Sequence, residues 1–407
     1  MANHHLAPND AVVVAYQRTP IGRARKGSLA EERPEDLALT AVGATLAQVP
    51  QLDPRELGDF YMGCAVPEGM QGDNIGRRVA VLAGMDFLPS ASVNRFCASS
   101  LQATAMAAQA IKAGDGDAYL VGGVESTSNQ PPISTRLYPG SEESAARADR
   151  LFESGTAWHD PREDGGTPDV YITMGKTAEF VAGLTGTTRP DQDEWALKSQ
   201  QAAAKAIERG YFAGEIAPYT RDDGTVVAAD DGPRPSTTRE ALAGLSPVFR
   251  PDGTVTAGNA SPLNDGASAL VVMSGRRAQE LGIPPLARIL GSAASALSPE
   301  IMGLGPVEAS GRLLRRLGLS IDDIDIIELN EAFAAQVVPV VRELGADPER
   351  VNPQGGAIAL GHPFGMTGAR LVGTLARSLQ VNDKTVGLAT LCVGGGQGMA
   401  LVLERVS

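Results

Sequence analysis

Cysteine and histidine are scarce in this sequence. The 407 residues include three cysteines and four histidines, which is too few for a disulfide framework or for a zinc site with paired ligands. Only His362 lies in a glycine-rich, apolar stretch, so we expect no metal site. The start of the chain lacks a basic segment followed by an apolar one. Together with the unpaired thiols, this predicts a reducing, cytoplasmic location.

Aromatic residues, positive charge and long apolar runs are also lacking. Aromatics make up 4% of the residues, which argues against a stacking surface for single-stranded nucleic acid. The net charge of −13 argues against nucleic acid or an anionic membrane as a partner. No apolar run reaches membrane-spanning length. An anionic ligand would therefore be held locally, by a few Arg or Lys side chains and by backbone N–H groups.

Two stretches of the chain predict the same order of elements. Each predicts a short apolar strand, a helix and a turn into a second strand: residues 11–16, 34–49 and 52–64 in the first stretch, and 286–291, 306–317 and 319–330 in the second. Alternating strands and helices favour an α/β fold with mostly parallel, doubly covered sheets. The repetition favours two duplicated halves, although α/β proteins can repeat such an order by coincidence.

A segment of different composition separates the two stretches. Residues 126–250 are rich in Pro, Gly, Asp and Arg, with one clear helical pattern at 191–209, which is typical of a lid or binding region. Residues 265–274 return to an apolar strand pattern and should rejoin the first sheet. We therefore predict an N-terminal half at 1–274, containing an inserted loop domain at 126–250, and a C-terminal half at 275–407.

Cys97 is the first candidate for chemistry. It precedes a predicted helix at 98–113 that is rich in Ala and Ser. The free N–H groups and positive dipole of a helix N-terminus would lower the thiol pKa and favour the nucleophilic thiolate. A lone cysteine can equally be a small buried hydrophobe, but Arg95 and the motifs below favour a nucleophile.

Three further residues suit thiol chemistry. His362, between Gly361 and Pro363, could act as general base, or be a structural histidine bound to a carbonyl. Cys392 begins Cys-Val-Gly-Gly-Gly-Gln-Gly, where glycines suggest close ligand approach, or only a bulge beside an inert thiol. Asn330 ends a predicted strand, where ligands bind in parallel sheets; alone it could be a turn residue.

The combination of motifs resembles the thiolases, the acetyl-CoA acyltransferases. Five pieces in this order carry the resemblance, which runs from Ala11 to the end: Asn94 to Ser100, Thr256 to Ser261, Asn330 to Ala334, Gly361 to Pro363, and Cys392 to Gly398. The resemblance implies a thiolase-like five-layer αβαβα fold of two related halves, with an inserted loop domain over the active site. It also implies CoA thioesters as substrates, no permanently bound cofactor, and a homodimer or homotetramer.

The resemblance assigns roles residue by residue. Cys97 would be acylated by an acyl-CoA while His362 takes its proton, and Cys392 would act as the second acid/base. One oxyanion hole would use His362 with a water held by Asn330, and the other the N–H groups of Cys97 and Gly394. The expected coenzyme A contacts are Ser261, Arg234, Phe249, Met302 and Phe333.

Some positions depart from acetoacetyl-specific members. Their Tyr-His-Met-Gly stretch is Ile172-Thr173-Met174-Gly175 here, and Pro262 stands where they have Gly. We therefore expect a 3-ketoacyl-CoA thiolase that acts mainly in degradation. The alternatives are a biosynthetic acetyl-CoA C-acetyltransferase and a relative that binds CoA or lipid without catalysis.

Overall fold

The computed structural model describes residues 6–131 and 138–406, so His4 and His5 lie outside the described residues. Its main feature is a 10-stranded sheet in the order β10-β11-β12-β9-β1-β8-β5-β3-β4, with β2 (Gly22–Arg23) paired to β8. The sheet consists of two half-sheets joined at β1 and β9, where Val12 pairs with Arg288 and Val13 with Ala287.

The first half-sheet is built from the N-terminal part of the chain. Its strands are β1 (Ala11–Arg18), β3 (Phe60–Gly63), β4 (Ser90–Val93), β5 (Ala118–Ser126) and β8 (Asn264–Ser274). β3 runs parallel to β4 and β5, whereas β8 is antiparallel to both β5 and β1. The predicted return of residues 265–274 to the first sheet is thus confirmed.

The second half-sheet repeats this pattern. Its strands are β9 (Ala287–Ala296), β10 (Ile326–Leu329), β11 (Val386–Val393) and β12 (Gln397–Glu404). β10 is parallel to β11, β12 is antiparallel to β11 and β9, and a parallel bridge from Ile327 to Val351 takes the place that β4 has in the first half. The shared strand order agrees with duplication of one unit.

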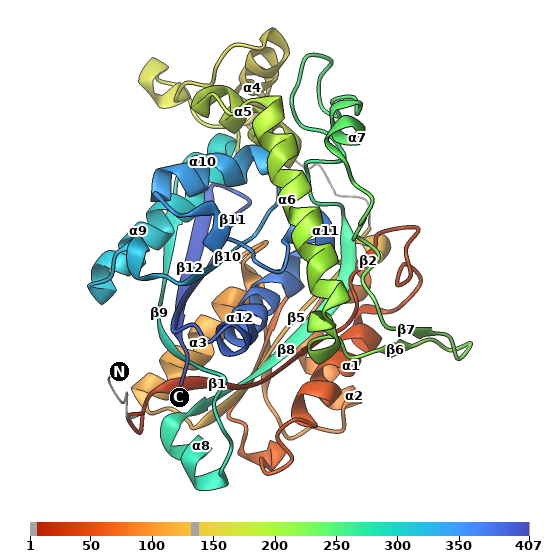
Figure 1. Cartoon of the computed structure of the whole chain (residues 1–407), viewed down its shortest axis with the longest axis vertical. Helices are drawn as coiled ribbons and strands as arrows, with labels where there is room; N and C mark the ends of the chain where they lie inside the picture. Colours follow the sequence, from red (N-terminus) through yellow and green to blue (C-terminus); the bar gives the residue numbers. More distant parts are fainter. Residues whose placement is uncertain (1–5, 132–137, 407) are drawn as a thin grey trace.

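Helices cover both faces of the half-sheets (Figure 1). The outer helices of the first half are α1 (Pro34–Leu46) and α2 (Ile75–Leu82), and those of the second are α9 (Gly305–Leu317) and α10 (Ala334–Leu344). Between the half-sheets lie α3 (Ser99–Ala113) and α12 (Phe364–Val381). Separate apolar cores fill the central space and the two outer spaces, so the predicted five-layer fold is confirmed.

The two central helices approach each other closely because small residues face one another. A Cβ on Gly368 of α12 would stand 2.1 Å from the backbone nitrogen of Leu101 on α3. Only glycine allows this distance. The close packing brings the N-terminal ends of α3 and α12, which follow Cys97 and His362, into one region of the molecule.

The segment between β5 and β8 contains more helix than its composition predicts. Beside the expected helix, seen as α6 (Arg189–Glu208), it contains α4 (Glu142–Ser154), α5 (Met174–Thr185), α7 (Arg239–Ala243) and the small pair β6 (Tyr219–Thr220) and β7 (Val226–Val227). α6 starts with a capping box between Thr188 and Asp191 and crosses the front of the molecule in Figure 1. The other helices escaped prediction because Gly, Pro and charged residues interrupt their apolar pattern.

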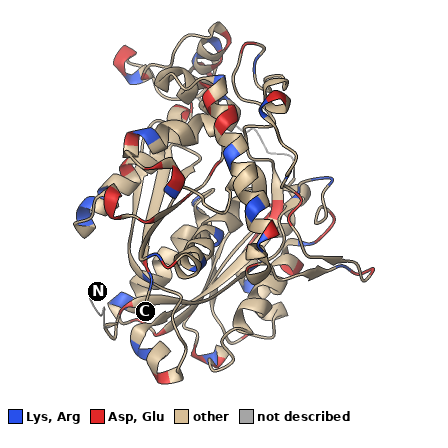
Figure 2. Ribbon diagram, in the orientation of Figure 1, with Lys and Arg blue, Asp and Glu red and all other residues tan. Residues whose placement is uncertain are grey.

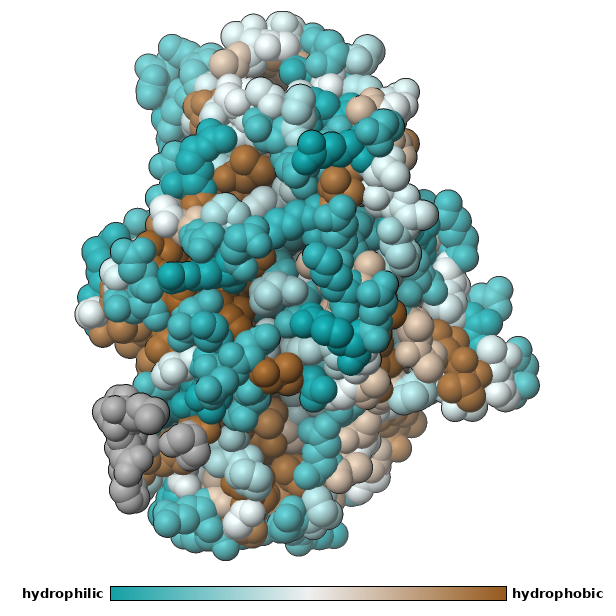
Figure 3. All heavy atoms as spheres, viewed as in Figure 1, coloured by the Kyte–Doolittle hydropathy of each residue, from teal (hydrophilic) through white to brown (hydrophobic). Residues whose placement is uncertain are grey.

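Charged residues lie mainly on the outer helices and loops, with both signs interspersed (Figure 2). On the face shown in Figure 3, hydrophilic residues predominate and apolar ones form separate patches. Within the described residues, no helix is both long and apolar enough to cross a membrane.

Candidate active site

Cys97 stands in a tight turn between β4 and α3. Phe96, just before it, has a φ of 44°, in the left-handed region that non-glycine residues rarely adopt. The turn is held by Asn94, whose side chain accepts the Phe96 N–H at 2.8 Å, and by Ser99, which accepts the Arg95 N–H at 3.0 Å. The sharp turn fixes the direction of the Cys97 side chain.

Arg95 connects the two halves of the protein. Its guanidinium donates to Gln102 on α3 at 2.9 Å and to Gln397 at the start of β12 at 2.8 Å. Gln397 follows the glycine turn after Cys392. Arg95 therefore holds the Cys97 turn against the Cys392 turn, a role that its position beside Cys97 in the sequence did not predict.

The electrostatics of Cys97 differ from the expectation for a helix N-terminus. Desolvation raises the pKa of the thiol to about 11, a hydrogen bond from the Gly394 N–H opposes this rise, and the negative charge of Glu125 adds to it. The predicted lowering of the pKa is therefore wrong. Desolvation outweighs the N–H groups that favour the thiolate, so the free thiol is protonated at neutral pH.

His362 is placed by an exceptional backbone position. Gly361 has a φ of 116°, and a Cβ there would stand 2.6 Å from Ile21 and 2.8 Å from Asn264. The His362 N–H donates to the Asn264 side chain at 2.9 Å. Glycine at 361 is thus required both by its φ and by the close approach of Ile21 and Asn264.

The imidazole is held at both ring nitrogens. Its Nδ1 lies 2.6 Å from the Thr367 hydroxyl, and its Nε2 lies 3.2 Å from the side-chain nitrogen of Asn330. The ring also packs edge-on against Phe364, with 5.0 Å between centroids. Burial and the positive charge of Arg370 lower the pKa of His362 to about 3, so the imidazole is neutral at neutral pH.

Cys392 lies at the end of β11 and is buried. Burial raises the pKa of its thiol, and the negative charge of a Cys97 thiolate raises it further, so the two sulfurs interact electrostatically. The chain then turns through Gly395 and Gly396, with φ values of 75° and 80°. These glycines let the turn bring the Gly394 N–H to the Cys97 sulfur.

Most of the expected coenzyme A contacts gather beside Cys392. Met302 forms a small apolar cluster with Cys392 and Ala332, against which Phe333 and Met174 pack. Phe249 meets Phe333 edge-on, with 6.3 Å between ring centroids, and is 40% exposed. Ser261 donates both its N–H and its hydroxyl to the Ala332 carbonyl, at 3.0 and 3.1 Å.

Arg234 lies apart from this cluster. It lines a pocket of about 220 Å³ formed by α6, α7 and Gly258, and its backbone N–H donates to the Gln200 side chain at 2.7 Å. Burial and the charge of Arg23 lower the pKa of its guanidinium. Gly258 belongs to the same motif as Ser261, so this pocket adjoins the expected coenzyme A channel.

Three buried carboxylates support the site and were not predicted to do so. Glu125 accepts N–H groups of Ala65 and Gly365 at 2.9 and 2.8 Å, which joins the two halves next to His362. Glu331 accepts from Trp195 and Ser199 of α6 at 3.0 and 2.6 Å. Their only signal in the sequence is a carboxylate next to an apolar strand.

Glu300 is the third of these carboxylates. It lies two residues before Met302 and accepts from the Trp158 indole at 2.7 Å, the Asp169 N–H at 2.8 Å and the Arg147 guanidinium. All three donors belong to the segment between β5 and β8. Glu300 thus attaches that segment beside the two methionines, Met174 and Met302, that surround Cys392.

Comparison with known proteins identifies the family. The model of the thiolase N-terminal domain matches residues 11–276, and that of the thiolase C-terminal domain matches residues 283–405. The chain belongs to the thiolase family. Its members are acyltransferases, and the predicted class of enzyme is confirmed.

Relatives of known name cover nearly the whole chain. The 3-ketoacyl-CoA thiolase of Bacillus subtilis is 41% identical over 97% of this chain and 99% of its own length. The beta-ketoadipyl-CoA thiolase of Pseudomonas aeruginosa is 46% identical over 96% of this chain and 97% of its own. Both relatives are named as thiolases, but their names give different acyl groups.

Solved structures agree with this assignment. The dimeric peroxisomal thiolase of Saccharomyces cerevisiae has a TM-score of 0.88 and 35% identity, with 99% of each chain covered. The human mitochondrial 3-ketoacyl-CoA thiolase in complex with CoA has a TM-score of 0.85 and 34% identity, and covers 99% of this chain and 100% of its own.

Proposed function

We propose that this thiolase cleaves a 3-ketoacyl-CoA with CoA, giving a shortened acyl-CoA and acetyl-CoA, in the degradation of fatty acids or related acyl groups. The observation that carries the proposal is the meeting of Cys97, from the first half, with His362, Asn330, Cys392 and Gly394 from the second. CoA and acyl-CoA act as substrates, and no permanently bound cofactor is required.

Cys97 is the nucleophile in this proposal. Its proton passes to neutral His362, the thiolate attacks the thioester or ketone carbonyl, and negative charge develops on the carbonyl oxygen. The N–H groups of Cys97 and Gly394 stabilise one such oxyanion, and His362 with a water held by Asn330 stabilises the other. Cys392 carries the proton to and from the α-carbon of the acetyl unit.

The coenzyme A moiety lies along Ser261, Phe249, Phe333 and Met302, with Arg234 nearest the phosphates. The cluster of Met302 and Phe333 beside Cys392 supports this path of the coenzyme A moiety. Arg234 supplies the positive charge that a strongly acidic chain needs in order to hold an anionic ligand locally.

A dicarboxylic 3-ketoacyl chain is the second candidate substrate. Relatives that carry the name beta-ketoadipyl-CoA thiolase are 42–46% identical, and 3-ketoacyl-CoA thiolases are 41–43% identical. A biosynthetic enzyme that forms acetoacetyl-CoA is less supported. Thr173 and Pro262 stand where the resemblance to acetoacetyl-specific members implies His and Gly.

Steady-state thiolysis tests the proposal. Purified protein is supplied with CoA and 3-ketohexanoyl-CoA, 3-oxoadipyl-CoA or acetoacetyl-CoA, and the two thioester products are quantified. We expect acetyl-CoA and the shortened acyl-CoA in equal amounts, with the six-carbon monocarboxylic substrate preferred. Binding of CoA without turnover of any substrate would instead indicate a non-catalytic relative.

We further propose a homodimer or homotetramer in the cytoplasm. β4 is the terminal strand of the sheet, and Leu82 and Phe87 near it are exposed; a terminal strand can pair with a second chain. The similar peroxisomal thiolase of Saccharomyces cerevisiae is dimeric. Light scattering coupled to size exclusion should give a mass of two or four chains.

A further inference from the structure

A stripe of polar residues runs along the buried helix α12. Thr367, Arg370, Thr374 and Ser378 follow one another at helical spacing, and all four are buried between the half-sheets. We refer to them as the α12 polar stripe. Since unpaired buried polar groups are strongly unfavourable, each member of the stripe must be bonded, and the bonds restrict how the helix can rotate.

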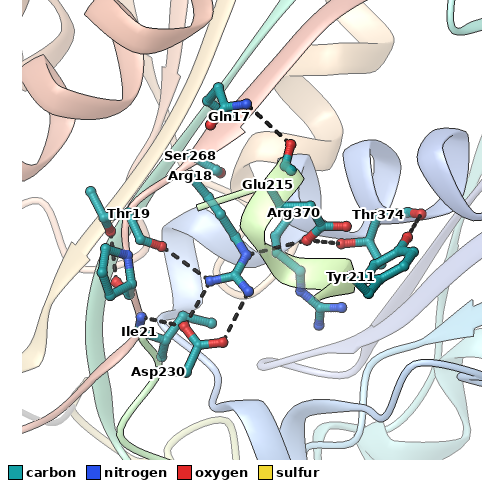
Figure 4. A network of polar contacts seen from close by, with 12 residues as sticks. Gln17, Arg18, Thr19, Ile21, Tyr211, Glu215, Asp230, Ser268, Arg370 and Thr374 are labelled. Atoms are coloured by element: carbon teal, nitrogen blue, oxygen red, sulfur yellow. Dashed lines mark hydrogen bonds and ion pairs between the residues drawn. The ribbon is translucent and has the colours of Figure 1, made fainter. Parts of the chain in front are cut away.

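Thr374 connects the α12 polar stripe to a network of ion pairs (Figure 4). The Thr374 hydroxyl donates to Glu215 at 3.1 Å, and Glu215 accepts from the Arg18 guanidinium at 3.3 Å. Arg18 also makes a two-pronged pair with Asp230, at 2.7 and 2.9 Å. These bonds connect α12 to β1 and to two positions of the inserted segment.

Arg370 extends the network toward the active site. It pairs with buried Glu328 on β10 at 3.2 Å, two residues before Asn330. Its positive charge also disfavours the protonated form of His362. The network therefore fixes α12 in rotation and keeps a positive charge one helical turn from Thr367.

Thr367 is the member of the stripe that contacts His362. Its hydroxyl lies 2.6 Å from His362 Nδ1 and donates to the Pro363 carbonyl at 2.8 Å. A hydroxyl has one hydrogen, so an oxygen that donates to Pro363 can only accept from Nδ1. On the other side of the ring, the Asn330 side-chain nitrogen faces Nε2 at 3.2 Å, which requires an acceptor there.

We propose that Thr367 is a positioning residue that fixes His362 as the Nδ1-protonated tautomer, with Nε2 as the unprotonated acceptor on the side of Asn330. This proposal deepens the proposed function and rests on it for its kinetic consequence. The Cys97 S–H proton moves to Nε2, and the resulting thiolate forms a bond to the thioester carbon. The bond from that carbon to the CoA sulfur breaks, and the leaving thiolate takes the proton back from the imidazolium.

Nuclear magnetic resonance tests the tautomer without turnover. The chain has four histidines, so selective ¹⁵N-histidine labelling gives few ring signals, and His362→Gln identifies those of His362. In the unmodified protein we expect Nδ1 to bear the hydrogen and Nε2 to be unprotonated. A His362 ring protonated mainly at Nε2 overturns the proposal, whatever the catalytic activity.

Variants test whether Thr367 is the cause. In Thr367→Val the hydroxyl is lost at nearly unchanged volume, so we expect a mixture of tautomers and a kcat lowered by about 10- to 100-fold with little change in KM. Thr367→Ser keeps the hydroxyl and should retain the single tautomer and most of the activity. If His362 keeps a single tautomer in Thr367→Val, the proposal is overturned. It is also overturned if Thr367→Ser folds but shows a mixture of His362 tautomers.

Thr374→Val is the matched control. It makes the same change two helical turns away, where the hydroxyl bonds Glu215 rather than His362. We expect a lower Tm but an unchanged His362 tautomer; an equal tautomer change in this variant would show a general packing effect and contradict the role of Thr367. If no variant or parent turns over any 3-ketoacyl-CoA, the proposed function fails, while the spectra still decide the tautomer.

Discussion

The two halves of the molecule share one arrangement of strands but differ in the connection between two of those strands. In the first half, the residues between β5 and β8 form the inserted helices that cover the site, whereas in the second half β11 and β12 are joined by the glycines at 394–396. Cys97 and His362 occupy equivalent places, each two residues before the first residue of a central helix. Duplication thus brings two equivalent positions together, and different residues there give them different chemistry.

The surroundings of these two positions also differ. Phe96, just before Cys97, is 46% exposed, whereas His362 is 2% exposed. Cys97 itself is partly buried, whereas Cys392 is buried like His362. In the proposed function, the first half supplies the more accessible thiol, and the second supplies a buried base and a buried second thiol. Substitutions in each half should separate these contributions.

The largest effect is expected for Cys97→Ala. Without the nucleophile neither acyl transfer nor carbon–carbon bond cleavage can proceed, so kcat/KM should fall on the order of 10⁴-fold or more. The measurement is thiolysis together with exchange of label between acetyl-CoA and free CoA. Exchange at the unmodified rate in this variant would place the nucleophile elsewhere.

Cys392→Ala should separate the two halves of the reaction. Loss of a general acid/base lowers a rate by about 10²–10⁴-fold, so thiolysis should fall by that amount while label exchange between acetyl-CoA and CoA is partly retained. The reason is that exchange requires only acylation of Cys97. An exchange rate as low as in Cys97→Ala would contradict separate roles for the two thiols.

The pH dependence of alkylation tests the protonation states of Cys97 and His362. Because the pKa of the Cys97 thiol is raised to about 11, the thiolate fraction rises about tenfold per pH unit below that value. Inactivation by iodoacetamide should follow this rise from pH 7 to 9, with protection by acyl-CoA. kcat/KM should change far less, since His362, with a pKa of about 3, stays neutral. An alkylation rate that levels off near pH 7 would instead show a preformed thiolate–imidazolium pair.

The smallest effect concerns the acyl chain. Thr173, the N-cap of α5 next to Met174, stands where we expect acetoacetyl-specific members of the family to have a larger histidine. Each CH₂ buried there contributes about 0.8 kcal/mol, or about fourfold in kcat/KM. We therefore expect thiolysis of six-carbon or branched 3-ketoacyl-CoAs to exceed that of acetoacetyl-CoA. Thr173→His should reduce this preference, and Thr188→His, at the exposed cap of α6, is the control.

The sequence was sufficient to predict the fold class, because its repeated strand–helix order and its motifs lie in local patterns. The thiolase motifs also identified Cys97, His362 and Cys392 as candidates. The sign of the Cys97 pKa shift was not predictable, since it depends on burial by segments far away in the chain and on Glu125. Thr367 gave no distinct signal, because α12 contains several other polar residues and the role of this hydroxyl depends on the His362 ring 2.6 Å away.

The most direct test of the shared site is to trap the acyl-enzyme. The unmodified protein is mixed with a 3-ketoacyl-CoA, quenched with acid within a turnover, digested and analysed by mass spectrometry. We expect the shortened acyl group on the peptide that contains Cys97, and its disappearance when CoA is added before the quench. Stable acylation of Cys392 with Cys97 unmodified would contradict the assignment of the nucleophile to the first half and the acid/base to the second.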